Sequence, residues 1–68
     1  MKYLEESELV DGEVYLCQNY DGHMLSCYFV KDSKEQPFEL EIFRNTVFSW
    51  AEIRYVFASK EDVRKIYQ

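Results

Sequence analysis

The clearest hydrophobic pattern in the chain lies in residues 13–31, EVYLCQNYDGHMLSCYFVK. Two runs rich in aromatic and aliphatic residues flank an Asp-Gly pair there. Such a pair between β-rich runs is typical of a β-hairpin, because a type I′ turn needs positive φ at both central residues and Gly and Asp tolerate it best. The pattern therefore predicts two antiparallel strands joined by a two-residue turn at Asp21 and Gly22.

A two-residue turn would fix the pairing of these strands and place Tyr15 opposite Tyr28. Because side chains alternate between the two faces of a strand, each face of the hairpin can be written down. The more aliphatic face, which we expect to line the core, holds Val14, Leu16, Gln18, Tyr20, His23, Leu25, Cys27 and Phe29. The other face holds Tyr15, Cys17, Asn19, Met24, Ser26, Tyr28 and Val30. Both faces are apolar near the middle, so the hairpin is expected to be covered on both sides.

Residues 38–44, FELEIFR, follow a polar loop that ends at Pro37. Apolar and acidic residues alternate here, with Phe38, Leu40 and Ile42 on one side and glutamates on the other. This alternation predicts a half-buried strand with water on its acidic face.

The next segment is predicted to turn at residues 45–46, extend briefly at 47–48 and turn again at 49–52. Residues 49–52, SWAE, match the S-x-x-E capping pattern of a helical turn, and Trp50 on that turn could close one end of the fold. Residues 53–58, IRYVFA, predict a further strand, with Ile53, Tyr55 and Phe57 sharing a face.

The sequence predicts a definite secondary structure for the C-terminal end of the chain but not for the N-terminal end. Ser59 is a suitable N-cap, acidic residues follow it and basic residues come later, so a short helix is predicted from there to the end. Residues 1–8 fit a short strand, a helical turn or a frayed arm, and Asp11-Gly12 predicts a turn before the first hairpin strand.

These elements predict one mostly β (α+β) domain over residues 1–68. Short links between successive strands favour an antiparallel meander. With four or five strands and a short C-terminal helix, the layout resembles small β-meanders and half-open SH3-like barrels.

The composition adds a strong asymmetry of charge. The chain has 68 residues, a net charge of −5 and 47% hydrophobic residues. Residues 1–24 hold one basic and six acidic side chains, which gives −5, whereas residues 25–68 hold seven of each, which gives zero. Direct nucleic-acid binding needs clustered cations and is not expected; a basic protein partner is compatible with this charge.

Cys17 and Cys27 fall on opposite faces of the predicted hairpin, so a disulfide between them is not expected. The acidic N-terminus, MKYLEESELV, lacks the apolar core of a secretory leader, and no apolar run approaches the roughly 20 residues of a membrane span. These features favour free thiols in a reducing compartment, and hence a cytoplasmic location without membrane contact.

Catalytic and metal-binding chemistry finds little support in the sequence. His23 and Cys27 share a predicted face, but they are four residues apart on one strand, or roughly 13 Å. There is no CxxC or HxxxH pair and no glycine-rich phosphate loop. Glu39 and Glu41 are expected on the solvent-exposed face of a strand and do not indicate a catalytic pair. We therefore expect neither an enzyme nor a bound cofactor or metal ion.

The aromatic content suggests protein binding. Twelve aromatic residues exceed the needs of a small core, and Tyr and Trp are enriched in interface hot spots. A first hypothesis is a protein-binding or self-associating module; a second is an acidic inhibitor that imitates nucleic acid and blocks a basic groove. The candidate partner-binding residues for these two hypotheses are Tyr15, Tyr28, Phe43, Trp50, Glu5, Glu6, Glu8 and Asp11.

Overall fold

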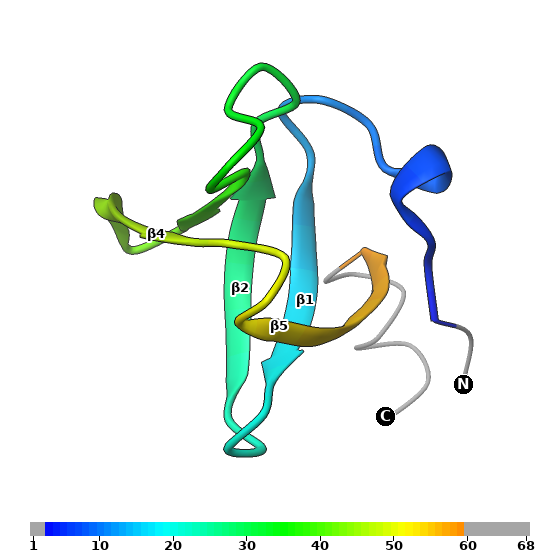
Figure 1. The fold of residues 1–68 in the computed structure, drawn as a ribbon, viewed down its shortest axis with the longest axis vertical. Coiled ribbons are helices and arrows are strands. Elements are labelled where there is room, and N and C mark those ends of the chain that lie inside the picture. Colours follow the sequence, from blue (N-terminus) through cyan, green and yellow to red (C-terminus); the bar gives the residue numbers. More distant parts are fainter. Residues whose placement is uncertain (1–2, 60–68) are drawn as a thin grey trace.

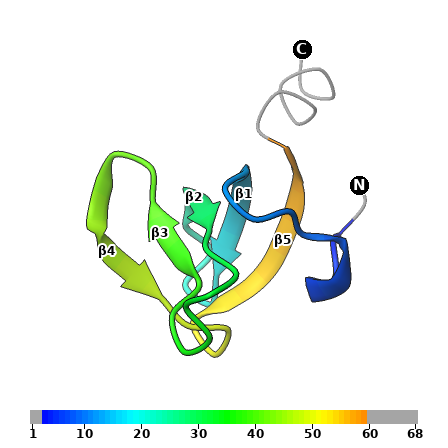
Figure 2. The same cartoon turned by 90° about the horizontal axis from the view of Figure 1, so that it is seen from above.

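The computed structural model describes residues 3–59, which form one open antiparallel sheet. The sheet has the strand order β4-β3-β2-β1-β5 (Figure 1). Seen from above, it is strongly curved, with β4 and β5 at its opposite ends (Figure 2). The prediction of a mostly β, antiparallel fold is confirmed, and the predicted C-terminal helix lies outside the described residues. The elements are η1 (Glu6–Glu8), β1 (Val14–Asn19), β2 (Met24–Phe29), β3 (Phe38–Leu40), β4 (Phe43–Phe48) and β5 (Ile53–Ser59).

The β1–β2 hairpin has a three-residue loop, so the predicted two-residue turn is wrong. Only Gly22 has positive φ, at 88°, whereas a type I′ turn would require it at Asp21 as well. The Gly22 amide donates to the Asn19 carbonyl at 3.1 Å, and the Asn19 amide donates to the His23 carbonyl at 3.1 Å. The Asn19 Oδ1 also accepts from the Asp21 and His23 amides, at 3.1 and 2.9 Å. The Asn19 side chain thus stabilises the longer loop.

This loop shifts the strand register by one residue. As a result, each side chain of β1 points to the face of the sheet opposite to the predicted one. Tyr15 lies opposite Cys27, and Cys17 lies opposite Leu25. The predicted core face is right for β2 but wrong for β1, because a slip of one residue exchanges the two faces of a strand. The predicted Tyr15–Tyr28 pair does not exist, since Tyr28 faces Val14. Cys17 and Cys27 lie on the same face and are both fully buried.

The core contains Phe38, which is the largest of the fully buried side chains among the described residues. The ring of Phe38 is 5.8 Å from that of Phe29 and 4.9 Å from that of Trp50. Aromatic rings supply much of the buried area in a chain this small. The buried cluster comprises Leu9, Tyr15, Cys17, Cys27, Phe29, Phe38, Ile53 and Val56, with Leu4, Leu25, Leu40, Phe48 and Trp50 packed against it.

The strand predicted over residues 38–44 ends earlier, at Leu40. The chain turns at residues 41–42, and Leu40 then pairs with Phe43. Ile42 was expected in the core, but it is 83% exposed. The turn predicted at residues 45–46 is also wrong, since both residues belong to β4. The earlier turn brings Phe48 opposite Phe38, so that β4 contributes to the core.

The predicted strand at residues 53–58 is confirmed as β5, but its alternation is interrupted. Register shifts against β1 place Ile53 opposite Asn19 and Val56 opposite Cys17. Ile53 and Val56 are therefore both buried in the core, contrary to the predicted faces. A bulge adds a residue on one strand only, and this resets which side chains point inward.

The turn between β4 and β5 keeps part of the predicted capping pattern. The Ser49 amide and hydroxyl both donate to Glu52 Oε1, at 3.1 and 3.2 Å. The Glu52 amide donates to the Ser49 carbonyl at 3.0 Å, which closes a single turn without a helix.

The N-terminal segment runs beside β5. Tyr3 forms an isolated bridge with Phe57 and stacks on Tyr55 at 4.3 Å between ring centroids. The Leu4 amide donates to the Val56 carbonyl at 2.7 Å. The chain then forms η1 and turns at residues 11–12, where Gly12 has a φ of 84°. The predicted turn at Asp11-Gly12 is confirmed, and this segment covers part of the outer edge of β5.

Candidate functional site

Tyr15, a candidate partner-binding residue, is part of the core. Its side chain is 6% exposed, and its hydroxyl accepts a hydrogen bond from the Val10 amide at 2.8 Å. This bond anchors the N-terminal segment to β1. Tyr15 therefore contributes to the fold in this structure and does not present a ring to a partner.

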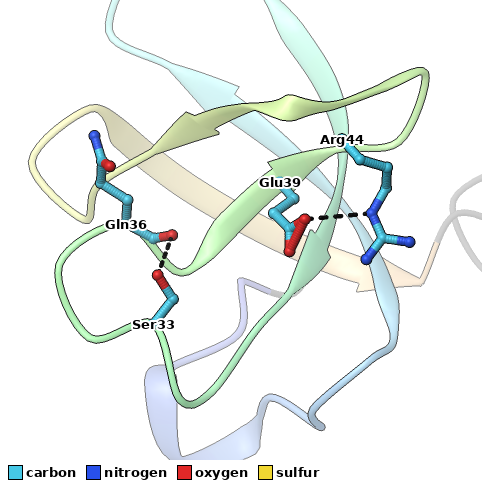
Figure 3. Close-up of polar contacts among 4 residues, drawn as sticks. All are labelled: Ser33, Gln36, Glu39 and Arg44. Atoms are coloured by element: carbon cyan, nitrogen blue, oxygen red, sulfur yellow. Dashed lines mark hydrogen bonds and ion pairs between the residues drawn. The ribbon is translucent and has the colours of Figure 1, made fainter.

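Tyr28 lies on the opposite face of the sheet, within a small polar and aromatic group. The guanidinium of Arg44 stacks over the Tyr28 ring at 4.1 Å from its centroid. The Nε of Arg44 also lies 3.3 Å from Glu39 Oε1 (Figure 3). An exposed ion pair of this kind contributes at most about 1 kcal/mol, but together the two contacts hold Arg44 flat against the sheet.

Phe43, another candidate, lies at the same end of the sheet and is exposed. Phe43 is 61% exposed and the neighbouring Ile42 is 83% exposed. We call Ile42, Phe43 and Arg44 the β4 end. Sequence reasoning placed Ile42 in the core and so missed it; the adjacent pair Ile42-Phe43, which interrupts strict alternation, was the available indication of a turn.

The acidic candidates lie together on the N-terminal segment. Glu5, Glu6, Glu8 and Asp11 are all exposed, and residues 5–13 contain five acidic and no basic side chains. Asp11 has a structural role, because its Oδ1 accepts a hydrogen bond from the Lys31 amide at 2.9 Å. Its first part, with η1, lies beside β5 at the end of the sheet opposite to β4 (Figure 2), and it then crosses to the end of β2, where residues 12 and 13 are hydrogen-bonded to Phe29.

Trp50, the last candidate, is half-buried in the turn between β4 and β5. It packs against the core and borders a hollow of about 450 Å³. Lys31 and Lys34 line the same hollow and were not among the predicted site residues. In the sequence, Lys31 ends the hairpin segment and Lys34 lies in the polar loop before Pro37, and neither position indicated a site.

The two cysteines are free thiols, as predicted, but for a different reason. They share a face, and what keeps them inaccessible is full burial. A hydrogen bond with Cys27 and burial both raise the pKa of Cys17 far above its ordinary value. A buried thiol that keeps its proton is a poor nucleophile, so Cys17 is assigned to packing.

This burial predicts slow thiol labelling. In native buffer at pH 8, a disulfide reagent such as dithionitrobenzoate should react with neither cysteine within minutes, because both sulfur atoms are covered. In denaturant it should label two thiols per chain immediately. The amount of released thionitrobenzoate measures this directly. Rapid labelling of either cysteine in the native protein would contradict the register described above.

Within residues 3–59 there is no group of three or more His, Cys, Asp or Glu side chains that could hold a metal ion. His23 is exposed in the hairpin loop. The same residues include no helix of the length and apolarity needed to cross a membrane.

Comparison with known proteins found no matching family model, no similar curated protein and no similar solved structure.

Proposed function

We propose that the chain is a non-enzymatic protein-interaction module that associates with a second copy of itself through the β4 end. The observation that carries the proposal is the exposure of Ile42 and Phe43, side by side at the edge of the sheet. Full burial of a large apolar side chain stabilises by about 1.5–3 kcal/mol. Two copies that cover these side chains would gain this contribution in each chain.

The distribution of charge supports a second copy as the occupant. Residues 42–48 contain one basic and no acidic side chain, although the whole chain carries −5. Of the acidic residues, Glu6 and Glu8 belong to η1, which lies beside β5 at the end of the sheet away from β4 (Figure 2), whereas Asp11 and Glu13 lie next to the end of β2. Contact through β4 therefore keeps the η1 turns of two copies far apart, which reduces their repulsion.

The edge itself also supports the proposal. β4 is the last strand of the sheet, whereas the N-terminal segment covers part of the outer edge of β5. Between the pairs Leu40–Phe43 and Glu39–Val47 the register shifts, so residues 44–46 form an irregular stretch. Backbone groups on an open edge can pair with another strand.

The test is the mass of the protein in solution. Sedimentation equilibrium should give twice the monomer mass at concentrations of about 100 μM, and Ile42→Ser with Phe43→Ser should give the monomer. The matched control is Val10→Ser with Met24→Ser, which removes two other exposed apolar side chains (57% and 47%) and should leave the dimer intact. A monomeric wild type, or equal weakening by both pairs, would overturn the proposal.

The second candidate remains an acidic inhibitor of a basic protein. It is supported by the run of exposed acidic residues at 5–13, which could speed encounter with a basic groove. Glu5→Gln with Glu6→Gln should then weaken binding to a basic partner and reduce its salt dependence. Asp11 is unsuitable for this test because of its bond to the Lys31 amide.

We also propose a cytoplasmic location and an SH3-like arrangement of the strands. Free thiols support a reducing, cytoplasmic location. The return of β5 to pair with β1 after a four-stranded meander supports a half-open SH3-like arrangement.

A further inference from the structure

A hollow of about 450 Å³ opens between the N-terminal segment, the loop after β2 and the turn after β4. Its apolar lining comes from Leu9, Phe29, Pro37 and Trp50. Binding sites for small molecules have volumes of about 300–1,000 Å³ and are mainly apolar with a few placed polar groups. The hollow fits this description in size, and its lining is more polar, since Glu6, Ser7, Lys31 and Lys34 make up half of the eight lining residues.

The aromatic part of this lining is held in place by the core. The Trp50 ring meets Phe38 edge to face, with centroids 4.9 Å apart and planes at 79°. It meets Phe29 in the same manner at 6.5 Å and 64°. A ring fixed by two neighbours loses little freedom when a ligand stacks on it, and this lowers the cost of binding.

The basic part of the lining comes from an ordered loop. Lys31 and Lys34 are both exposed there. The Lys31 amide is tied to Asp11, and Ser33 Oγ donates to the Gln36 carbonyl at 3.0 Å within the loop (Figure 3). These bonds keep the two lysines beside the aromatic lining.

The charges around the hollow favour an anion. Within residues 3–59 no ion pair holds Lys31 or Lys34. Glu6 is the acidic side chain among the lining residues, so the local balance is two cations to one anion in a chain that carries −5. A carboxylate placed between two ammonium groups gains charge-assisted hydrogen bonds from both.

We propose that this hollow binds a small organic acid with an aromatic ring. The ring lies against Trp50 and Phe29, and the carboxylate points toward Lys31 and Lys34. This site is separate from the β4 end and does not depend on self-association.

Trp50 provides the readout, since it is the only tryptophan in the chain. Titration with phenylacetate should change its fluorescence and shift its indole N–H resonance at concentrations on the order of 1 mM, as expected for a fragment-sized ligand. Acetate, which lacks the ring, and phenethylamine, which carries the opposite charge, should bind at least tenfold more weakly. Equal binding of phenethylamine, or no response to phenylacetate at 10-fold higher concentration, would overturn the proposal.

Two variants of equal charge change separate the basic groups of the hollow from the overall charge. Lys31→Gln with Lys34→Gln should weaken phenylacetate binding at least tenfold while leaving the circular dichroism spectrum unchanged. Arg54→Glu changes the net charge by the same two units at an exposed position outside the hollow and should leave binding unchanged. Equal effects of the two variants would contradict the proposed site.

The end of a polypeptide could supply the same ring and carboxylate. A Gly-Gly-Phe tripeptide with a free C-terminus should bind no more tightly than phenylacetate. Binding of the tripeptide at least tenfold more tightly would overturn the assignment to a small molecule.

Discussion

Replacement of Phe38 by alanine is expected to unfold most of the protein at room temperature. Phe38 is fully buried and touches the rings of Phe29 and Trp50. Loss of a buried phenylalanine side chain costs about 3–5 kcal/mol, because the transfer free energy is lost and a cavity remains. A single core in a chain of this size supplies about 3–5 kcal/mol in total. The loss is therefore comparable with the whole free energy of unfolding.

Urea denaturation followed by circular dichroism and Trp50 fluorescence measures this effect. The matched control is Phe43→Ala, because Phe43 is a phenylalanine of the neighbouring strand and is 61% exposed. At protein concentrations of about 1 μM, far below the roughly 100 μM at which self-association through the β4 end is expected, its free energy of unfolding should lie within about 0.5 kcal/mol of wild type. A folded Phe38→Ala variant with a wild-type midpoint would show that Phe38 is not buried in the core.

The elements of the sheet could be predicted from the sequence because they depend on local patterns. The Asp21-Gly22 pair between β-rich runs indicated the hairpin, and residues 53–58 indicated β5; both exist. Turn residues and side-chain preferences act over a few positions. They define where the chain runs extended and where it reverses.

Which side chains of β1 and β5 point into the core could not be predicted, because one extra residue in a turn or bulge reverses their orientation. The Asn19 side chain accepts two amide hydrogen bonds, which stabilise a hairpin loop one residue longer than predicted. The longer loop exchanges the inward and outward side chains of β1. The register shifts in β5 likewise bring Ile53 and Val56 to the same face. Secondary-structure propensity does not distinguish the alternative strand registers, because their energies differ through contacts between segments that are distant in the sequence.

The candidate surfaces were predicted only in part for the same reason. Trp50 and Phe43 retain exposed area next to a hollow and at a sheet edge. Tyr15 was assigned to a partner-binding face because of the mistaken register. Lys31 and Lys34 could be recognised as candidate site residues only from the folded structure, in which they line the same hollow as Trp50.

The register itself yields the second large prediction, a strong difference between Tyr15→Ala and Tyr28→Ala. Under a two-residue turn these tyrosines would be paired neighbours on one face, with similar costs. In the structure Tyr15 is 6% exposed and its hydroxyl accepts from the Val10 amide. Tyr15→Ala should therefore cost about 3–5 kcal/mol. Tyr28 is half-buried beneath Arg44, so Tyr28→Ala should cost about 1 kcal/mol.

Tyr15→Phe separates the two contributions of Tyr15. It keeps the ring in the core but leaves the Val10 amide without its partner, so the expected loss is about 1 kcal/mol. Urea denaturation of the three variants under identical conditions gives the comparison, and Tyr28→Phe serves as the control for removal of a hydroxyl from a half-buried tyrosine. Equal losses for Tyr15→Ala and Tyr28→Ala would contradict the three-residue loop, and with it the burial of both cysteines on one face.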